Sequence, residues 1–373
     1  MRLQLKLGAI ALLAMAGSAH ADGSLTLRTV YYKERATRVE QPMLDGIFDV
    51  GTRGVLTGHV LVDAITSASA GSGAANAQPF TERRYEGAVG YMHQLDHLRL
   101  GGDLKYSTES DYRSIYLGAR AEADLAQKNF VVGAGGGVSL DQVSAASAQG
   151  PSVPTIDCTP DQASSAATDC SLHVLSGFLS ASQIVSRNAL VAVTYDIQRL
   201  DGFQANPYRL VVTNTGFAPE THPDARTRQA IAVSGRYYVP ATETTLIAAY
   251  RYYTDDWQIH AHTPELRIVQ QAGDSLDASV RYRYYSQSQS FFYAERYANA
   301  DPTMNPFVTD DPKMSAFTGH TLEAKLGVLG QAFSLGGNWS GARIEGILEY
   351  IIQNNRFGNA VVAHLALTVP FAY

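Results

Sequence analysis

In the last fifteen residues of the chain, 359–373, an apolar row of side chains alternates with a mixed row. The mixed row holds His364, Thr368 and small residues. A period of two is that of a β-strand, because successive side chains of a strand point to opposite faces. The stretch is also long enough for a tilted membrane strand, which needs about 10 residues. The apolar row consists of Val361, Ala363, Leu365, Leu367, Val369, Phe371 and Tyr373.

Two aromatic residues, Phe371 and Tyr373, end this row. The ending resembles the C-terminal strand of bacterial outer-membrane β-barrels. The resemblance implies that the barrel-assembly machinery reads these residues as a signal, and that the last strand closes a barrel against the first. The alternative is the last strand of a soluble sandwich.

Residues 1–21 have the three parts of a secretory signal peptide. Arg2 and Lys6 form a basic start, an apolar run follows, and Ala19-His20-Ala21 is a small-residue cleavage site. We exclude this segment and take 22–373 as the barrel domain. Without Arg2 and Lys6, the formal net charge is 27 − 35 = −8. That charge argues against a binding role on nucleic acid or on an anionic lipid surface.

The mature chain divides into further segments of the same alternating kind. Its 21 Tyr and 32 Gly fit strands that face lipid on one side and water on the other. No apolar run is long enough for a transmembrane helix. We predict an all-β, up-and-down antiparallel transmembrane β-barrel of about 16 strands, with about 14 as the fallback. The segments are 24–36, 42–50, 55–69, 83–94, 97–110, 112–125, 130–143, 172–184, 188–199, 227–238, 244–257, 259–271, 275–292, 316–333, 342–353 and 359–373.

The lengths of the connections agree with such a barrel. The four long polar gaps are the third, seventh, ninth and thirteenth, so all are odd, while the even gaps are short. Odd gaps lie at one end of an up-and-down barrel and even gaps at the other. Outer-membrane barrels have long outer loops and short periplasmic turns. An even strand number also brings both ends of the barrel domain to the periplasmic side.

The phase of the segments assigns charged side chains to the barrel interior, because a charge facing lipid at mid-bilayer costs roughly 2–4 kcal/mol. We predict a lumen lined by both signs of charge, serving either as a hydrated channel or as a salt-bridged plug. The four arginines of the candidate set lie on neighbouring or nearly neighbouring strands, which predicts a positive strip. The lumen and selectivity candidates are Asp103, Lys105, Arg236, Arg251, Arg281, Arg283, Glu323, Lys325, Glu345 and Glu349.

Cys158 and Cys170 lie in one polar segment of an exported chain, which predicts a disulfide. The bridge would contribute about 3 kcal/mol in the chain-entropy model. Two thiols with His173 as the nearby addition make a poor metal site, so we expect neither a metal nor another cofactor.

His260 and His262 share one face of a segment near Asp255 and Asp256. These side chains could supply metal ligands, or a base and a carboxylate for hydrolysis. We prefer an aromatic girdle with hydrogen-bonded partners at the membrane interface. Because no GxSxG, HExxH, P-loop or dinucleotide motif is present, we assign no catalytic residue.

Several stretches resemble a family of proteobacterial outer-membrane proteins known only as a domain of unknown function, DUF3570. They spread over nearly the whole mature chain. The resemblance implies a barrel and adds no substrate. The stretches are 31–34, 107–112, 127–129, 206–209, 227–228, 250–257 and 281–293.

Three functions remain open. The first is a porin-like outer-membrane channel for small solutes, since barrels of this strand number can enclose an aqueous passage. The second is an outer-membrane lipid or ester hydrolase that uses His260 or His262. The third is a structural or adhesive barrel that acts through its outer loops. The predicted partners are outer-membrane lipid, the barrel-assembly machinery and small solutes.

Overall fold

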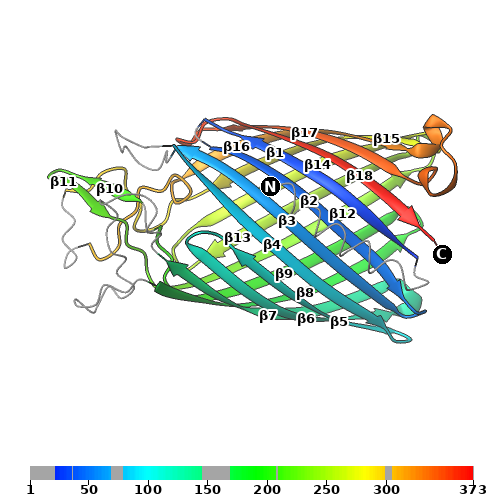
Figure 1. The fold of residues 1–373 in the computed structure, drawn as a ribbon, viewed down its shortest axis with the longest axis horizontal. Coiled ribbons are helices and arrows are strands. Elements are labelled where there is room, and N and C mark those ends of the chain that lie inside the picture. Colours follow the sequence, from blue (N-terminus) through cyan, green and yellow to red (C-terminus); the bar gives the residue numbers. More distant parts are fainter. Residues whose placement is uncertain are drawn as a thin grey trace.

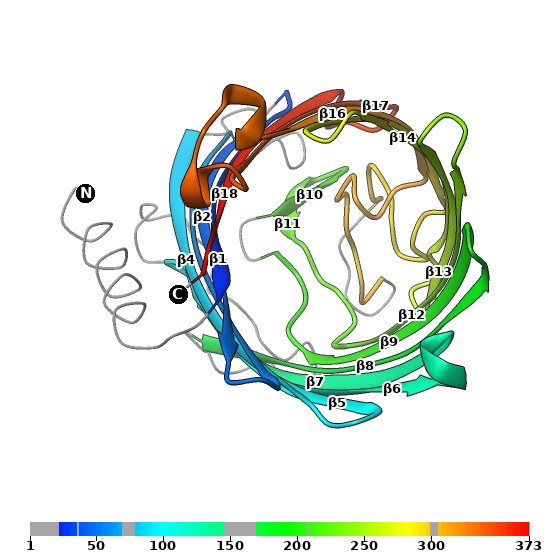
Figure 2. The same ribbon diagram turned by 90° about the vertical axis from the view of Figure 1, so that its right-hand side faces the viewer.

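Sixteen strands form one closed antiparallel barrel (Figures 1 and 2). The computed structural model describes residues 22–35, 37–68, 79–144, 169–206, 209–298 and 305–372. Each barrel strand pairs with the next in sequence, except that β9 pairs with β12, and β1 pairs with β18 to close the ring. The predicted fold class and strand number are confirmed. Within the described ranges, no helix is long and apolar enough to cross a membrane.

The strands follow the predicted segments closely, and the largest shifts are at the start of β2 and the end of β15. β2 begins at Thr37 and contains Pro42, which lies opposite Thr29 of β1, whereas the prediction began the strand at the proline. The bounds are β1 (Gly23–Lys33), β2 (Thr37–Val50), β3 (Gly54–Ala68), β4 (Pro79–Gln94), β5 (Leu98–Thr108), β6 (Tyr112–Leu125), β7 (Phe130–Ser144), β8 (Asp169–Ser186), β9 (Ala189–Gly202), β12 (Ala225–Val239), β13 (Thr244–Asp255), β14 (His260–Ala272), β15 (Leu276–Gln287), β16 (Phe317–Leu329), β17 (Arg343–Gln353) and β18 (Ala360–Phe371).

Two further strands, β10 (Leu210–Thr213) and β11 (Gly216–Pro219), form a hairpin outside the barrel wall. The hairpin belongs to the connection between β9 and β12, where the sequence pattern predicts a loop throughout. Its strands have four residues each, which is too short for an alternating pattern to stand out. Short 3-10 turns, η1 (Ala126–Lys128), η3 (Gly330–Phe333) and η4 (Gly337–Trp339), lie in two of the short connections.

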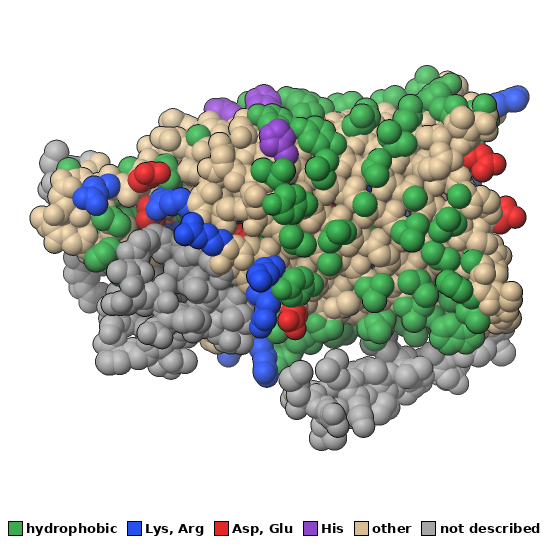
Figure 3. Space-filling view, turned by 90° about the horizontal axis from the view of Figure 1, so that it is seen from above, with side chains coloured by type: hydrophobic (Ala, Val, Ile, Leu, Met, Phe, Trp, Pro, Cys, Tyr) green, Lys and Arg blue, Asp and Glu red, His purple; other side chains and the backbone are tan. Residues whose placement is uncertain are grey.

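The barrel wall is apolar on the outside and polar on the inside. On β6, Ile115 and Leu117 are 49% and 59% exposed, whereas Asp124 on the alternate face is 7% exposed. The same alternation covers the barrel surface with apolar side chains (Figure 3). Buried carboxylates beside exposed leucines are the reverse of a soluble protein, and they fit a wall that faces lipid.

The connections sort the barrel into two ends. The long connections after β3, β7, β9 and β15 leave from one end, here called the loop end, where the hairpin β10–β11 also lies (Figure 1). The connections after β2, β4, β6, β8, β12, β14 and β16, all of them short, lie at the other, the turn end, with the first residue of β1 and the last residue of β18. The short connections after β1, β5, β13 and β17 lie at the loop end. The predicted placement of all four long connections at one end is therefore observed.

The seam between β1 and β18 runs over eleven residue pairs, from Gly23 opposite Phe371 to Lys33 opposite Val361. Phe371 faces outward, and its ring centroid lies 5.8 Å from that of Phe48 on β2. Gly23 leaves room for this ring, since a Cβ there would lie 2.8 Å from it. Tyr373 lies outside the described residues, so its role in assembly stays a prediction.

The seam predicts a specific assembly defect. Replacing Phe371 by Ala removes the ring contact that spans β18 to β2, so we expect less barrel to close and insert. The measurement is the heat-modifiable, folded fraction on gels of outer-membrane preparations. The control is Tyr237→Ala, which removes an outward aromatic ring, 51% exposed, from β12. Equal loss in both variants would contradict a role specific to the seam.

Candidate functional site

Arg281 on β15 is the centre of an ion-pair network on the lumen wall. Its guanidinium contacts Glu323 on β16, lies 3.3 Å from Glu349 on β17, and lies 3.4 Å from Glu265 on β14. Glu323 lies directly opposite Arg281 in the strand register and is also 3.7 Å from Arg267. The Arg281 and Glu323 side chains are 11% and 5% exposed. These charges cross-link four strands and are largely shielded from water.

A second network lies nearer the turn end, on β15, β16 and β17. Arg343 contacts Asp277 and lies 2.8 Å from Glu345, and Lys325 lies 2.6 Å from the same Glu345 oxygen. Two of the predicted lumen residues, Lys325 and Glu345, are therefore partners of one another. Together the two networks line the inside of β14 to β17 with paired charges.

The predicted positive strip divides into two kinds of arginine. Arg281 is paired as above, and Arg283 lies 3.6 Å from Glu265 with 35% of its side chain exposed. Arg236 on β12 and Arg251 on β13 also face inward and are exposed. Neither forms an ion pair with a described residue, although the Arg251 guanidinium lies 5.6 Å from the ring centre of Tyr253. The arginines of the strip are thus ion-paired on β15, whereas those on β12 and β13 have no ion-pair partner among the described residues.

The opposite part of the lumen also carries accessible charge. Asp103 and Lys105 both face inward on β5, and Lys105 lies 3.7 Å from Glu86 with 43% of its side chain exposed. Arg28 on β1 faces inward, lies 3.9 Å from Asp45 and is 44% exposed. Charged groups with this much free surface inside a barrel require water, because moving an ion from water into an apolar medium is very costly.

One section of the wall has no inward side chains of its own and is covered by those of the neighbouring strands. Gly133, Gly135 and Gly137 of β7 face inward, on the same side as Asp141. A Cβ at Gly135 would lie 2.5 Å from the inward ring of Phe178 and 2.8 Å from a backbone oxygen. Glycine therefore lets this ring, and the Tyr116 ring beside Gly137, pack against the backbone of β7.

His260 and His262 lie on the outer face of β14 and are exposed, in phase with Leu266 and Ile268. Of the two carboxylates predicted near them, Asp255 faces the other way and is bonded to Arg226, and Asp256 accepts from the backbone N–H of Thr227. Among the described residues, neither carboxylate is hydrogen-bonded to these histidines. The histidines are bonded to tyrosine hydroxyls, as expected for an aromatic girdle.

The connections after β9 and β15 form a packed unit over the loop end, here called the cap (Figures 1 and 2). Its apolar centre is Val211, Val308 and Tyr297. The Tyr297 hydroxyl donates its one proton to the backbone oxygen of Phe292 at 2.6 Å, with that of Thr309 as the alternative acceptor at 2.9 Å, and accepts from the backbone N–H groups of Ala294 and Thr309. The cap is thus an ordered structure, which sequence analysis missed because its strands are short.

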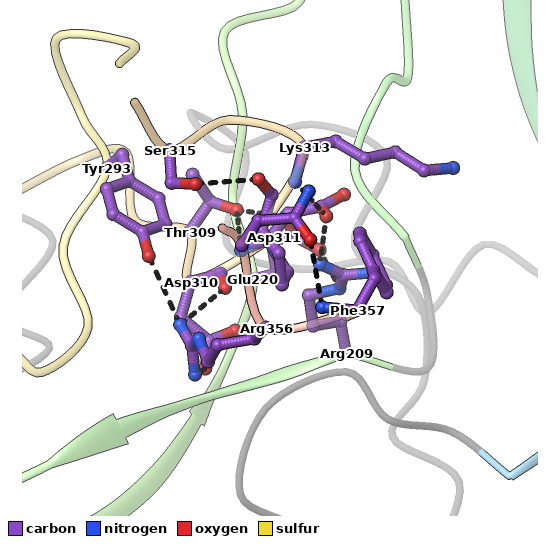
Figure 4. A network of polar contacts seen from close by, with 12 residues as sticks. Arg209, Glu220, Tyr293, Thr309, Asp310, Asp311, Lys313, Ser315, Arg356 and Phe357 are labelled. Carbon is purple, nitrogen blue, oxygen red and sulfur yellow. Dashed lines mark hydrogen bonds and ion pairs between the residues drawn. The ribbon is translucent and has the colours of Figure 1, made fainter. Parts of the chain in front are cut away.

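A buried polar network ties the two connections together (Figure 4). The Glu220 side chain has no exposed surface, and it is bonded to His222 at 2.5 Å and approached by Arg209 at 3.5 Å. Arg209 also lies 2.7 Å from Asp311 of the second connection. Thr309 donates to Glu220 from the same connection. A set of charges that meets only in the folded cap could not be paired from the sequence.

Asp310 is the least satisfied member of this network. Its side chain is fully buried, and neither carboxylate oxygen has a hydrogen-bond partner within the described ranges. Arg356, from the connection between β17 and β18, lies 3.7 Å away and donates to the Asp310 backbone oxygen. Burial outweighs the favourable charges of Arg356 and Arg209 and raises the pKa of Asp310 to about 6.

Trp257 fixes the cap to the barrel. It is 2% exposed, and its ring centroid lies 5.2 Å from that of His222 and 5.1 Å from that of Phe292, both in the cap. On its other side the Arg226 guanidinium lies 4.0 Å from the ring centre. Arg226 is in turn bonded to Asp255 of β13. The contact therefore runs from the cap through the indole to the barrel wall.

One group of carboxylates, Glu82, Glu109 and Asp111, is close enough to share a cation. Their oxygens lie within 4.8 Å of one another at the loop end. Burial, reinforced by the charge of Glu82, raises the pKa of Glu109 to about 7. Ser110 donates to Glu82, and Arg84 lies 4.0 Å from Glu109, so protein groups already compensate part of this charge.

Cys170 lies at the loop end of β8 and is buried. Cys158 lies outside the described residues, so the predicted disulfide stays a prediction. Residues 1–21 are also outside the described ranges, and the signal peptide is untested for the same reason.

The fold and the site together define a membrane β-barrel with a charged interior. The family model of DUF3570, described as a protein of unknown function, matches residues 3–361, and the chain belongs to this family. The predicted resemblance is confirmed. No curated protein matches the sequence.

Solved structures with a similar fold include a bacterial polysaccharide outer membrane secretin, with a TM-score of 0.52 and 6% identity over 95% of this chain and 100% of that chain. Pseudomonas aeruginosa OprD has a TM-score of 0.49 and 8% identity, over 94% of this chain and 95% of that one. P. aeruginosa OccK2 (OpdF) in complex with glucuronate has a TM-score of 0.45 and 12% identity, over 94% and 98%. At these identities the likeness concerns the fold alone.

The Arg281 network predicts a difference between two arginines. Arg281→Gln leaves Glu323, Glu349 and Glu265 without their shared cation, so we expect a loss of roughly 3 kcal/mol in the free energy of unfolding. Arg251→Gln removes an unpaired, solvated charge and should change the free energy of unfolding by at most about 0.5 kcal/mol. Urea titration of the barrel refolded into lipid vesicles measures both. Similar costs for the two variants would show that the network is not cross-linking the wall.

Asp310 predicts a pH-dependent cap. Because the pKa of Asp310 is raised in the folded cap, the closed cap holds this proton more tightly than the open one. The contribution of Asp310 to cap stability is therefore complete below about pH 4 and is lost as pH rises through about pH 6. Hydrogen-exchange protection of the Thr309 amide, corrected for intrinsic rates, should fall over that window. Asp310→Asn should remove this fall, and an unchanged fall in the variant would assign it to another group.

Proposed function

We propose that the protein is a porin-like outer-membrane channel for small hydrophilic solutes. The observation that carries the proposal is the combination of an apolar barrel exterior with inward charged side chains that remain exposed to water. Lys105 and Arg28, with 43% and 44% of their side chains exposed, are examples. A barrel that served as a mere structural plug would bury such groups in pairs throughout.

We further propose that residues 1–21 are a cleaved signal peptide and that the loop end faces the outside of the cell. The long connections lie at that end, as is usual for outer-membrane barrels. The cap then stands at the entrance of the lumen, and Trp257 fixes it there. Solutes would have to pass beside it.

Solute selection is assigned here to the unpaired arginines. Arg236 and Arg251 have no carboxylate partner among the described residues, so they present net positive charge to the lumen. Arg281 and Arg283 lie beside Glu265, and their charges are largely compensated. Fixed charge on a pore wall biases which ions enter. The channel should therefore favour anions.

The selectivity test is a double substitution of Arg236 and Arg251 by Gln. We expect the cation-to-anion permeability ratio to rise by roughly twofold, because the uncompensated positive charge of the wall is lost. The measurement is the reversal potential of refolded protein in a planar bilayer under a salt gradient.

The matched control replaces Arg83 and Arg113 by Gln, which removes two positive charges from the outer face of β4 and β6. It should leave the reversal potential unchanged. A conducting, folded Arg236/Arg251 variant with unaltered preference would rule out these two residues as the selectivity element. A protein that folds and never conducts would refute the channel itself.

A further inference from the structure

Three histidines on the outer face of the barrel are each held by a tyrosine hydroxyl. The distances from Tyr Oη to His Nδ1 are 2.6 Å for Tyr250 and His262, 3.2 Å for Tyr252 and His260, and 2.8 Å for Tyr282 and His320. All three pairs lie toward the loop end of β13 to β16.

The hydroxyl contacts determine what the other ring nitrogen can do. With the tyrosine hydroxyl donating to Nδ1, the proton of the neutral imidazole is on Nε2, which then donates on the opposite side of the ring. A phosphate oxygen at Nε2 would select this tautomer over the one in which Nδ1–H donates to the tyrosine. No described residue accepts from Nε2 of His260, His262 or His320. The three rings thus offer oriented donors at the outside of the wall.

An apolar groove with a volume of 440 Å³ runs down the same face. Its sides include Leu266, Val280, Leu322 and Leu348. Ala324 lies between Val280 and Leu348 in the strand register, and its small side chain leaves the depression. The lining is almost entirely apolar, so the groove suits a hydrocarbon chain.

Tyr282 connects the groove to the histidines, because its ring lines the groove while its hydroxyl is bonded to His320. Basic side chains continue the same border across the seam, where Lys33 of β1 lies opposite Arg38 of β2. Figure 3 shows histidine and basic side chains where the apolar wall meets the loop end. The negative net charge of the chain does not describe this border, since acidic groups such as Glu323 face the lumen.

We propose that this surface binds a phosphorylated, multiply acylated glycolipid of the outer leaflet, with one acyl chain in the groove and a phosphate on the histidines. The inference rests on the proposed outer-membrane placement and is independent of channel activity. Surrounding lipid is as apolar as the groove, so burial of the chain gives no net hydrophobic gain. The groove therefore selects by shape, and the charge-assisted contacts to phosphate give the discrimination.

The test is native mass spectrometry of the refolded full chain with two probes, bisphosphorylated lipid A and its dephosphorylated form. We expect wild-type protein to bind the phosphorylated probe about tenfold more tightly, one decade in Kd. Substituting His260, His262 and His320 by Gln should abolish that preference. Ala324→Phe, which fills the groove, should weaken the binding of both probes equally and leave the ratio of their affinities unchanged.

The matched control is Ala119→Phe, an outward alanine on β6 that lies away from the groove. It should leave both affinities unchanged, and an effect equal to that of Ala324→Phe would reduce the binding to non-specific lipid contact. Equal affinity of wild type for both probes would overturn the phosphate site. A lipid-free dimer that Ala324→Phe dissociates would replace the lipid by a second copy of the chain. Conductance recorded on the same samples separates these outcomes from failure of the channel proposal.

Discussion

Every backbone N–H and C=O in this wall needs a partner within the protein, because lipid offers none. The pairing of β1 with β18 meets that requirement by removing both edges of the sheet. Once the ring is closed, the two-residue period of each strand determines which side chains face lipid and which face the lumen. The row that faces the lumen must then hold the charged side chains. The position of Phe371 against Phe48 and the inward direction of Arg281 are thus consequences of one closure.

Inside the ring, the same kind of residue serves two purposes. Arg281 lies among Glu323, Glu349 and Glu265 and cross-links the wall. Arg251 lies over an aromatic ring, and no described carboxylate compensates its charge. The difference comes from the residues directly opposite in the strand register: Glu323 lies opposite Arg281, whereas Ala232 and Thr263 lie opposite Arg251. A lumen can therefore be cross-linked and charged at once.

The strands and their facing could be predicted from the sequence because both follow from a local pattern. The alternation around Ile115 and Leu117 fixed β6 to the residue, and it placed Arg281 and Glu323 inside. The partners could not be predicted, since they depend on register between strands. The cap was missed for a related reason: Glu220, Asp310 and Arg356 come from three separate connections and meet only after folding. The four-residue strands of the cap are also too short to show an alternating pattern.

The three glycines of β7 have a geometric consequence. Around the closed ring, β7 lies diametrically across from β17, which carries Glu345 and Glu349. On the glycine side the inward rings of Phe178 and Tyr116 cover the backbone, in the space that a Cβ would need, and on the other side the wall carries paired charges. The interior therefore has two unlike sides, one aromatic and one ionic. A molecule inside the barrel would meet ring faces on one side and fixed ions on the other.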